Sequence, residues 1–231
     1  MKRSALWNFV RKDDRFPYLL LIPIYYIGFW LEESLIQSNY RVSYLPLDDK
    51  IPFLEGFIIP YILWLPFLCA CGLYLFCRDR DGYKKFMTLF AVSFYTTLLL
   101  YALFPNGQDL RPEVFPRDNL LTRFIANVVY KADTNTNVCP SLHVIGAMNV
   151  CYAVFHCKSL RKTRIRVLTV CSAILISIST VFVKQHSILD IFLAIPFSLL
   201  CYLLCYPLDL PGKLVRRIKA ARAARKAPPA L

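Results

Sequence analysis

Six long apolar segments leave little of this chain for anything except membrane-spanning helices. They occupy residues 16–37, 52–77, 84–104, 140–157, 165–184 and 187–207. Each has about the 20 residues that cross a hydrocarbon core of roughly 30 Å, and an irregular chain in lipid would leave its backbone groups unpaired. Hydrophobic residues make up 57% of the 231, more than in ordinary soluble domains. The sequence therefore predicts an all-α fold: a polytopic membrane bundle of six transmembrane helices, forming one domain over residues 1–231.

Basic residues lie between and beyond these segments. The net charge is +13, but the Lys and Arg residues form short clusters and do not follow one face. This pattern favours anionic lipid headgroups as partners and argues against nucleic acid. Short basic tails are expected at 1–15 and 208–231, and the stretch 213–226 is predicted to be a basic helix on the membrane surface.

The distribution of positive charge also predicts the orientation of the chain. Three quarters of the 28 Lys and Arg residues lie in the two tails and in the second and fourth connections between segments. The excess of Lys and Arg stays on the cytoplasmic side of a membrane. We therefore expect a multi-pass integral membrane protein with both termini cytoplasmic and with its third and fifth connections facing outward.

Polar residues that can take part in catalysis are expected to lie together on the outward side. They come from three parts of the chain: Arg111 from the third connection, Ser141 and His143 from the start of the fourth segment, and Lys184, His186 and Asp190 from the turn between the fifth and sixth. His186 and Asp190 are four residues apart, so on a helix they share one face and the carboxylate can accept a hydrogen bond from the imidazole. The second ring nitrogen of His186 is then free to act as a nucleophile or base.

The remaining polar residues suit a phosphate group. Pro140 is typical of a first helical turn, where backbone N–H groups around Ser141 can bind a phosphate oxygen. His143 at this helix start is placed to protonate a leaving oxygen. Arg111 can bind phosphate through two parallel hydrogen bonds, and Lys184 offers a point charge. Alone, each residue also has a structural interpretation: an interfacial histidine is more often structural than catalytic, and Lys184 can extend to the headgroups.

The combined pattern resembles a known family. Arg111-Pro112, Pro140-Ser141-x-His143 and Ser179-x(6)-His186-x(3)-Asp190 resemble the tripartite signature of the type-2 phosphatidic acid phosphatase superfamily, which also contains vanadium haloperoxidases and some sphingolipid phosphotransferases. The resemblance covers roughly residues 103–196. It implies a phosphohistidine on His186, with Asp190 orienting it and His143 as general acid. It also implies that Arg111 holds the phosphoryl oxygens, that Ser141 adds hydrogen bonds, and that no metal or other cofactor is needed.

The chain departs from that signature at three positions. Phe104 stands where the family usually has Lys, Thr180 where it has Arg, and Leu142 where it has Gly. Two phosphate-binding cations are therefore missing, and Lys184 is a candidate replacement for one. Leu142 and the segments around Pro52 and Tyr61 look more like the branch that includes inositol phosphorylceramide synthases. With fewer cations, a singly charged phosphodiester is favoured slightly over a dianionic monoester.

Three functions remain open from the sequence. In a lipid phosphatase, water attacks the phosphohistidine; in a phosphotransferase, a lipid alcohol acceptor attacks it instead. A non-catalytic protein that binds or transports lipid headgroups is the alternative from another class, although simple anion binding needs neither an acid nor an oriented nucleophile. A metal site built from Cys139, His143, His186 and Asp190 is disfavoured because Arg111 and Lys184 would repel a divalent cation.

Overall fold

The computed structural model describes residues 13–35 and 38–226, which are mostly helical. The longer helices are α3 (Leu21–Leu35), α5 (Trp64–Arg78), α6 (Arg80–Leu103), α9 (Leu142–His156), α10 (Thr163–Phe182), α11 (Ile188–Cys205) and α12 (Leu210–Lys226). The shorter elements are α2 (Phe16–Leu19), η1 (Asp48–Lys50), η2 (Glu55–Phe57), α4 (Ile58–Ile62), α7 (Leu120–Phe124), the π-helical turn η3 (Ile125–Val129), α8 (Tyr130–Ala132) and η4 (Lys158–Leu160). The prediction of an all-α fold is thus confirmed.

The prediction of six spans is confirmed only in part. Within the described residues, four helical stretches are long and apolar enough to cross a membrane: Glu55–Arg78, Arg80–Leu103, Thr163–Phe182 and the stretch beginning at Ile188. The fourth predicted segment forms only the 15 residues of α9. At 1.5 Å per residue such a helix is about 22 Å long, shorter than a hydrocarbon core of roughly 30 Å.

The first predicted segment is also shorter than expected. Its helix is divided at Leu20 into α2 and α3. Pro23 lies in the first turn of α3, where its missing N–H leaves no hydrogen bond to the preceding turn. The 15 residues of α3 end in the acidic pair Glu32 and Glu33, which limits the apolar length further. Residues 36 and 37 of the prediction lie outside the described part.

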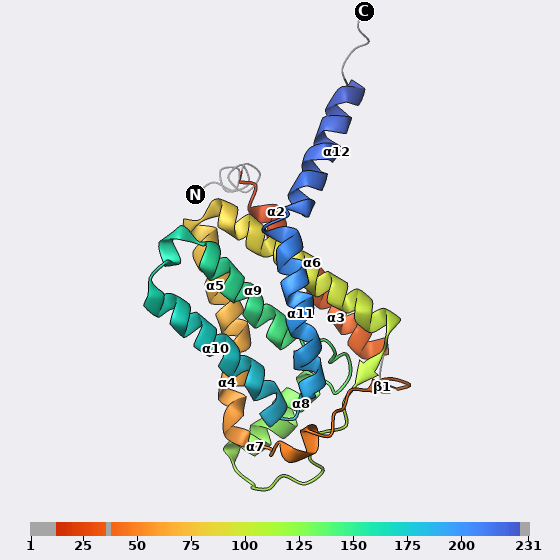
Figure 1. Cartoon of the computed structure of the whole chain (residues 1–231). Coiled ribbons are helices and arrows are strands. Elements are labelled where there is room, and N and C mark those ends of the chain that lie inside the picture. Colours follow the sequence, from red (N-terminus) through yellow and green to blue (C-terminus); the bar gives the residue numbers. More distant parts are fainter. Residues whose placement is uncertain (1–12, 36–37, 227–231) are drawn as a thin grey trace, which may run out of the picture.

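Helix α9 forms the centre of the bundle. It packs against α5, α6, α10 and α11, while α3 packs against α6 (Figure 1). Small residues such as Gly146 and Ala147 let neighbouring helices approach it closely. Because most of its side chains are buried, α9 is a core helix, and its N-terminal residues are enclosed by the surrounding elements.

The long connection between α6 and α9 closes one end of the bundle. It contains the short helical elements α7, η3 and α8, with longer irregular segments before and after them. Its strand β2 (Asn106–Gly107) pairs in parallel with β1 (Arg41–Val42), and Asn106 also binds the backbone N–H groups of Val138 and Cys139. Figure 1 shows α7, α8 and β1 at the end of the bundle opposite α2 and α12.

The basic helix predicted over 213–226 is present as the greater part of α12. It begins at Leu210, after Asp209 at a left-handed φ of 47°. Figure 1 shows α12 projecting from the α2 end of the bundle. The exposed side chains of Lys213, Arg216, Arg217 and Lys219 therefore lie far from the end closed by α7 and α8.

Candidate active site

His186 and Asp190 meet as predicted, but not on one helical face. His186 precedes α11, whose N-cap is Ser187, and Asp190 lies in the first turn. The Nδ1 atom of His186 lies 3.1 Å from Oδ2 of Asp190. The same carboxylate oxygen accepts the backbone N–H of Ser187 at 2.9 Å, completing a capping box. The imidazole is thus held by the helix cap.

The carboxylate of Asp190 is fully buried and well supplied with donors. Besides His186 and Ser187, it accepts a hydrogen bond from the hydroxyl of Ser43 and contacts the thiol of Cys139. Burial, with the charge of Asp190 beside it, raises the pKa of the Cys139 thiol to about 12. The thiol is therefore protonated at neutral pH. A buried carboxylate with several donors is a suitable acceptor for an Nδ1–H of His186, and in the neutral ring with this tautomer Nε2 carries the free lone pair.

A second aspartate, Asp48, binds the start of α11 from a distant part of the chain. Asp48, 1% exposed, accepts the N–H of Ile188 at 2.8 Å and the hydroxyl of Ser187 at 2.6 Å. It satisfies donors at the start of α11 that the helix itself cannot satisfy. Sequence analysis missed Asp48 because it lies about 140 residues from its partners along the chain.

His143 faces His186 between two aromatic rings. The two imidazole centroids are 5.5 Å apart. On α9, His143 stacks against Tyr61 at 4.4 Å and lies 4.5 Å from Trp64. A Cβ atom added at Gly146 would lie 2.7 Å from Nε1 of Trp64, so the indole occupies space that only glycine leaves open. Within the described residues, neither nitrogen of His143 has a hydrogen-bond partner.

The N-terminus of α9 presents unpaired donors beside His143. The helix begins at Leu142, later than expected, so Pro140 precedes the N-cap Ser141 instead of lying in the first turn. The hydroxyl of Ser141 is fully buried, caps nothing and has no partner among the residues that the structure describes. The N–H groups of Leu142 and His143 likewise have no acceptor in that part of the chain. This end of α9 can bind an anion.

Arg111 lies next to the site, but its guanidinium is hydrogen-bonded to other groups of the protein. Its guanidinium donates to the side-chain oxygen of Gln185 through Nε at 3.0 Å, and to the backbone carbonyls of Tyr130 and Asp133. It also lies 4.3 Å from the centre of the Tyr130 ring. Burial lowers its pKa, although the guanidinium stays charged at neutral pH. Four of its contacts are hydrogen bonds to Gln185 and the two carbonyls, which use most of its five N–H groups.

The side chain of Lys184 is hydrogen-bonded to the protein. Its ammonium donates to the backbone carbonyl of Asp48 at 2.8 Å. Lys184 has a left-handed φ of 55°, which turns its side chain out of the helical spacing used to predict it. Burial lowers its pKa, with the nearby charges of Asp48 and Asp49 acting in the opposite direction. Lys184 therefore supports the turn before α11, and its role as a replacement phosphate-binding cation stays a prediction.

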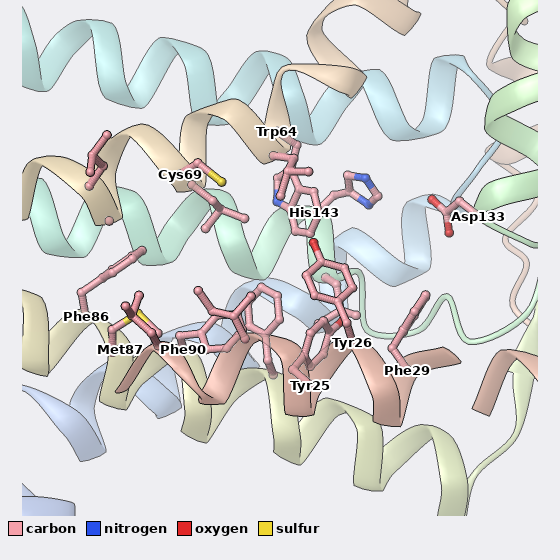
Figure 2. Close-up of a pocket in the computed structure, with 18 of the residues that line it drawn as sticks. Tyr25, Tyr26, Phe29, Trp64, Cys69, Phe86, Met87, Phe90, Asp133 and His143 are labelled. Atoms are coloured by element: carbon pink, nitrogen blue, oxygen red, sulfur yellow. The ribbon is translucent and has the colours of Figure 1, made fainter. Parts of the chain in front are cut away.

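An apolar pocket of about 590 Å³ opens beside the two histidines. Figure 2 shows it extending from Asp133 and His143 at one end to Phe86 and Met87 at the other. Its walls come largely from α3, α5 and α6. Of the six residues predicted from sequence, only His143 and His186 line it; Asp190 lies behind His186, and Arg111, Ser141 and Lys184 do not form its wall.

Several residues of the site were not singled out from the sequence. Asp133 and Gln185 line the pocket, and Tyr61 donates its hydroxyl to the carboxylate of Asp133. Gln185 links these groups to Arg111 through hydrogen bonds. It lies directly before His186 in the chain, and this position is the sequence feature that could have identified it. Asp133 belongs to the loop that precedes α9, and no sequence pattern marks it.

The chain was compared with protein-family models, curated proteins and solved structures, and none of them matches it. Over the described ranges 13–35 and 38–226, no group of three or more His, Cys, Asp or Glu residues is arranged to hold a metal ion. The alternative metal site that included Cys139 thus gains no support.

Proposed function

We propose that the chain is a membrane enzyme that cleaves a lipid phosphate ester, with His186 as nucleophile. One observation carries this proposal: two imidazoles lie 5.5 Å apart at the polar end of an apolar pocket, and only one of them is oriented by a buried carboxylate. Two histidines with only a structural role would not need a carboxylate beside one ring and none beside the other. The arrangement supports different roles for the two rings.

In the proposed reaction, Nε2 of His186 attacks phosphorus while the bond from phosphorus to the leaving oxygen breaks. Asp190 accepts the Nδ1–H hydrogen bond and balances the positive charge that forms on the ring. His143 has to carry a proton at this step, which the negative charge of a bound phosphate would favour, and it gives that proton to the leaving oxygen. The free N–H groups of Leu142 and His143 are placed to bind the phosphoryl oxygens.

The form of the pocket supports a lipid substrate. Its lining includes many aromatic and aliphatic side chains, among them Phe29, Leu68 and Phe90, on helices that lie within the bundle. An apolar pocket of this volume favours an acyl or prenyl chain, because its burial from water or polar headgroups is favourable. The resemblance to the type-2 phosphatidic acid phosphatase superfamily agrees with this proposal.

The second step distinguishes hydrolase from transferase. Water attacking the phosphohistidine would release phosphate or a phosphate monoester, whereas a lipid alcohol would form a new ester. A non-catalytic lipid-binding protein is the second candidate, and the engagement of Arg111 and Lys184 with protein groups is the observation that favours it. Such a protein would keep its lipid affinity but show no histidine-dependent turnover.

We further propose a six-span topology in which α3 and α9 are short spans and the active site faces outward. A cysteine at Val114, 84% exposed near α7, is expected to react with a membrane-impermeant thiol reagent in intact cells. One at the exposed Ser159 is expected to react only after permeabilisation. The measurement is labelling above that of the parent chain. The opposite pattern would place the site on the cytoplasmic side.

The general-acid role of His143 predicts a dependence on the leaving group. We expect His143→Ala to slow cleavage of an alkyl phosphate ester by about 10²- to 10⁴-fold. An activated aryl ester with a good leaving group should be slowed far less, because its oxygen departs without a proton. Steady-state rates on the two substrates give the ratio.

His143→Gln is the matched second variant, since it keeps a polar side chain between Tyr61 and Trp64. It should show the same selective loss. Equal losses on both esters, in both variants, would assign His143 a packing role instead.

A further inference from the structure

The charge of the pocket wall restricts which charged groups a substrate can carry. Among the described residues that line the pocket, Asp133 is the only Lys, Arg, Asp or Glu. It lies at the histidine end, where Figure 2 shows its carboxylate directed toward the same space as the ring of His143. A site for a phosphate ester thus has a negative side chain, and no positive one, in the wall that the ligand touches.

The carboxylate of Asp133 has one polar partner in the described part of the chain. Its Oδ2 accepts the hydroxyl of Tyr61, while Oδ1 accepts no hydrogen bond there. The nearby donors Arg111 and Gln185 bind the backbone carbonyl of Asp133 and not its carboxylate. Among the described residues Asp133 forms no salt bridge, although the guanidinium of Arg111 interacts electrostatically with its carboxylate. One carboxylate oxygen therefore remains available to a ligand.

A second acidic residue supports the negative potential of this loop. Glu33 of α3 accepts hydrogen bonds from the hydroxyl of Thr134 and, at 2.9 Å, from the side chain of Asn137. Asn137 itself lines the pocket. The loop that follows Asp133 is therefore held against α3 by the side chain of Glu33.

We propose that the ester bound in this pocket carries a positively charged amine, which Asp133 binds. This inference rests on the proposed function and names its substrate class: a zwitterionic phospholipid with an ethanolamine or choline headgroup. Its phosphate would lie at the start of α9 and its ammonium between Asp133 and the rings of Tyr26 and Phe29, which line the same end of the pocket (Figure 2). Aromatic faces attract such cations.

The charges explain why other phosphate esters fit less well. A dianionic monoester beside His186 would be repelled by the carboxylate, and at low dielectric this repulsion is strong. A diester with a glycerol headgroup carries the same phosphate charge but leaves Oδ1 of Asp133 without a cation. Only a zwitterionic diester satisfies both the donors of α9 and the carboxylate.

The test uses the full chain in lipid nanodiscs and four lipids with identical acyl chains: phosphatidylethanolamine, phosphatidylcholine, phosphatidylglycerol and phosphatidic acid. Wild-type kcat/KM, followed by mass spectrometry of products, should be about tenfold or more higher for a zwitterionic lipid than for phosphatidylglycerol. Asp133→Asn keeps an acceptor for Tyr61 and should remove this preference, lowering the zwitterionic kcat/KM while leaving phosphatidylglycerol unchanged or improved. Asp118→Asn, at an exposed acid paired with Arg123 outside the pocket, is the matched control and should change nothing.

Binding separates this inference from the proposed function. The His186→Ala protein should retain the zwitterionic lipids over phosphatidylglycerol, and His186→Ala with Asp133→Asn should not. Turnover without a zwitterionic preference, or an equal loss on every lipid in Asp133→Asn, would overturn the inference and leave the function standing. Selective binding without turnover of any lipid would do the reverse. Equal binding of all four lipids by the His186→Ala protein would also overturn the inference.

Discussion

Replacement of His186 by Ala is expected to reduce turnover by about 10⁴-fold or more, because the covalent intermediate has no other nucleophile. His186 is the only imidazole in the described residues that a carboxylate orients, through the 3.1 Å contact to Asp190. Rapid quenching with a phosphate-labelled lipid at alkaline pH should leave label on the wild-type protein and none on His186→Ala. Adding an acceptor alcohol should divert label into a new lipid if the enzyme is a transferase.

The third histidine of the chain provides the control. His156 lies at the far end of α9 and contacts the hydroxyl of Tyr202 at 2.9 Å. His156→Ala removes the same functional group from the same helix bundle, and we expect it to keep both activity and label. Activity of His186→Ala within about tenfold of wild type would show that another group attacks phosphorus.

The sequence predicted the helical segments better than their lengths. Apolar composition identifies a helix in lipid, but it equally identifies a helix such as α9 that other helices of the bundle surround. Hydropathy does not distinguish these two causes. The break at Leu20 depends on local backbone geometry next to Pro23, and this too is weakly marked in the sequence.

The contact between His186 and Asp190 was predictable because it is local, whereas the groups around it come from distant parts of the chain. His186 and Asp190 are close in sequence and stay close in any turn that leads into a helix. Asp133 and Asp48 reach the site from remote loops, so only the tertiary fold brings them there. The orientation of Lys184 could not be predicted from helical spacing, because a single left-handed residue changes the direction of its side chain.

The second large effect is expected from Asp190→Asn, which should slow the reaction by about 10³- to 10⁴-fold with the fold retained. The amide can keep one acceptor for the N–H of Ser187 and turn its NH₂ group toward the hydroxyl of Ser43, which then accepts instead of donating. What the variant loses is the negative charge that fixes the tautomer of His186 and balances its positive ring after attack.

Asp48→Asn separates this electronic role from support of the helix. Asp48 binds the same turn through Ser187 and Ile188 but does not contact His186. Each variant replaces one buried carboxylate that accepts hydrogen bonds from the start of α11, so both should lower the melting temperature. Only Asp190→Asn should combine that shift with loss of the labelled phosphohistidine. If the two variants lost activity in proportion to their melting temperatures, Asp190 would be a structural cap, and the orientation of His186 would have to come from another group.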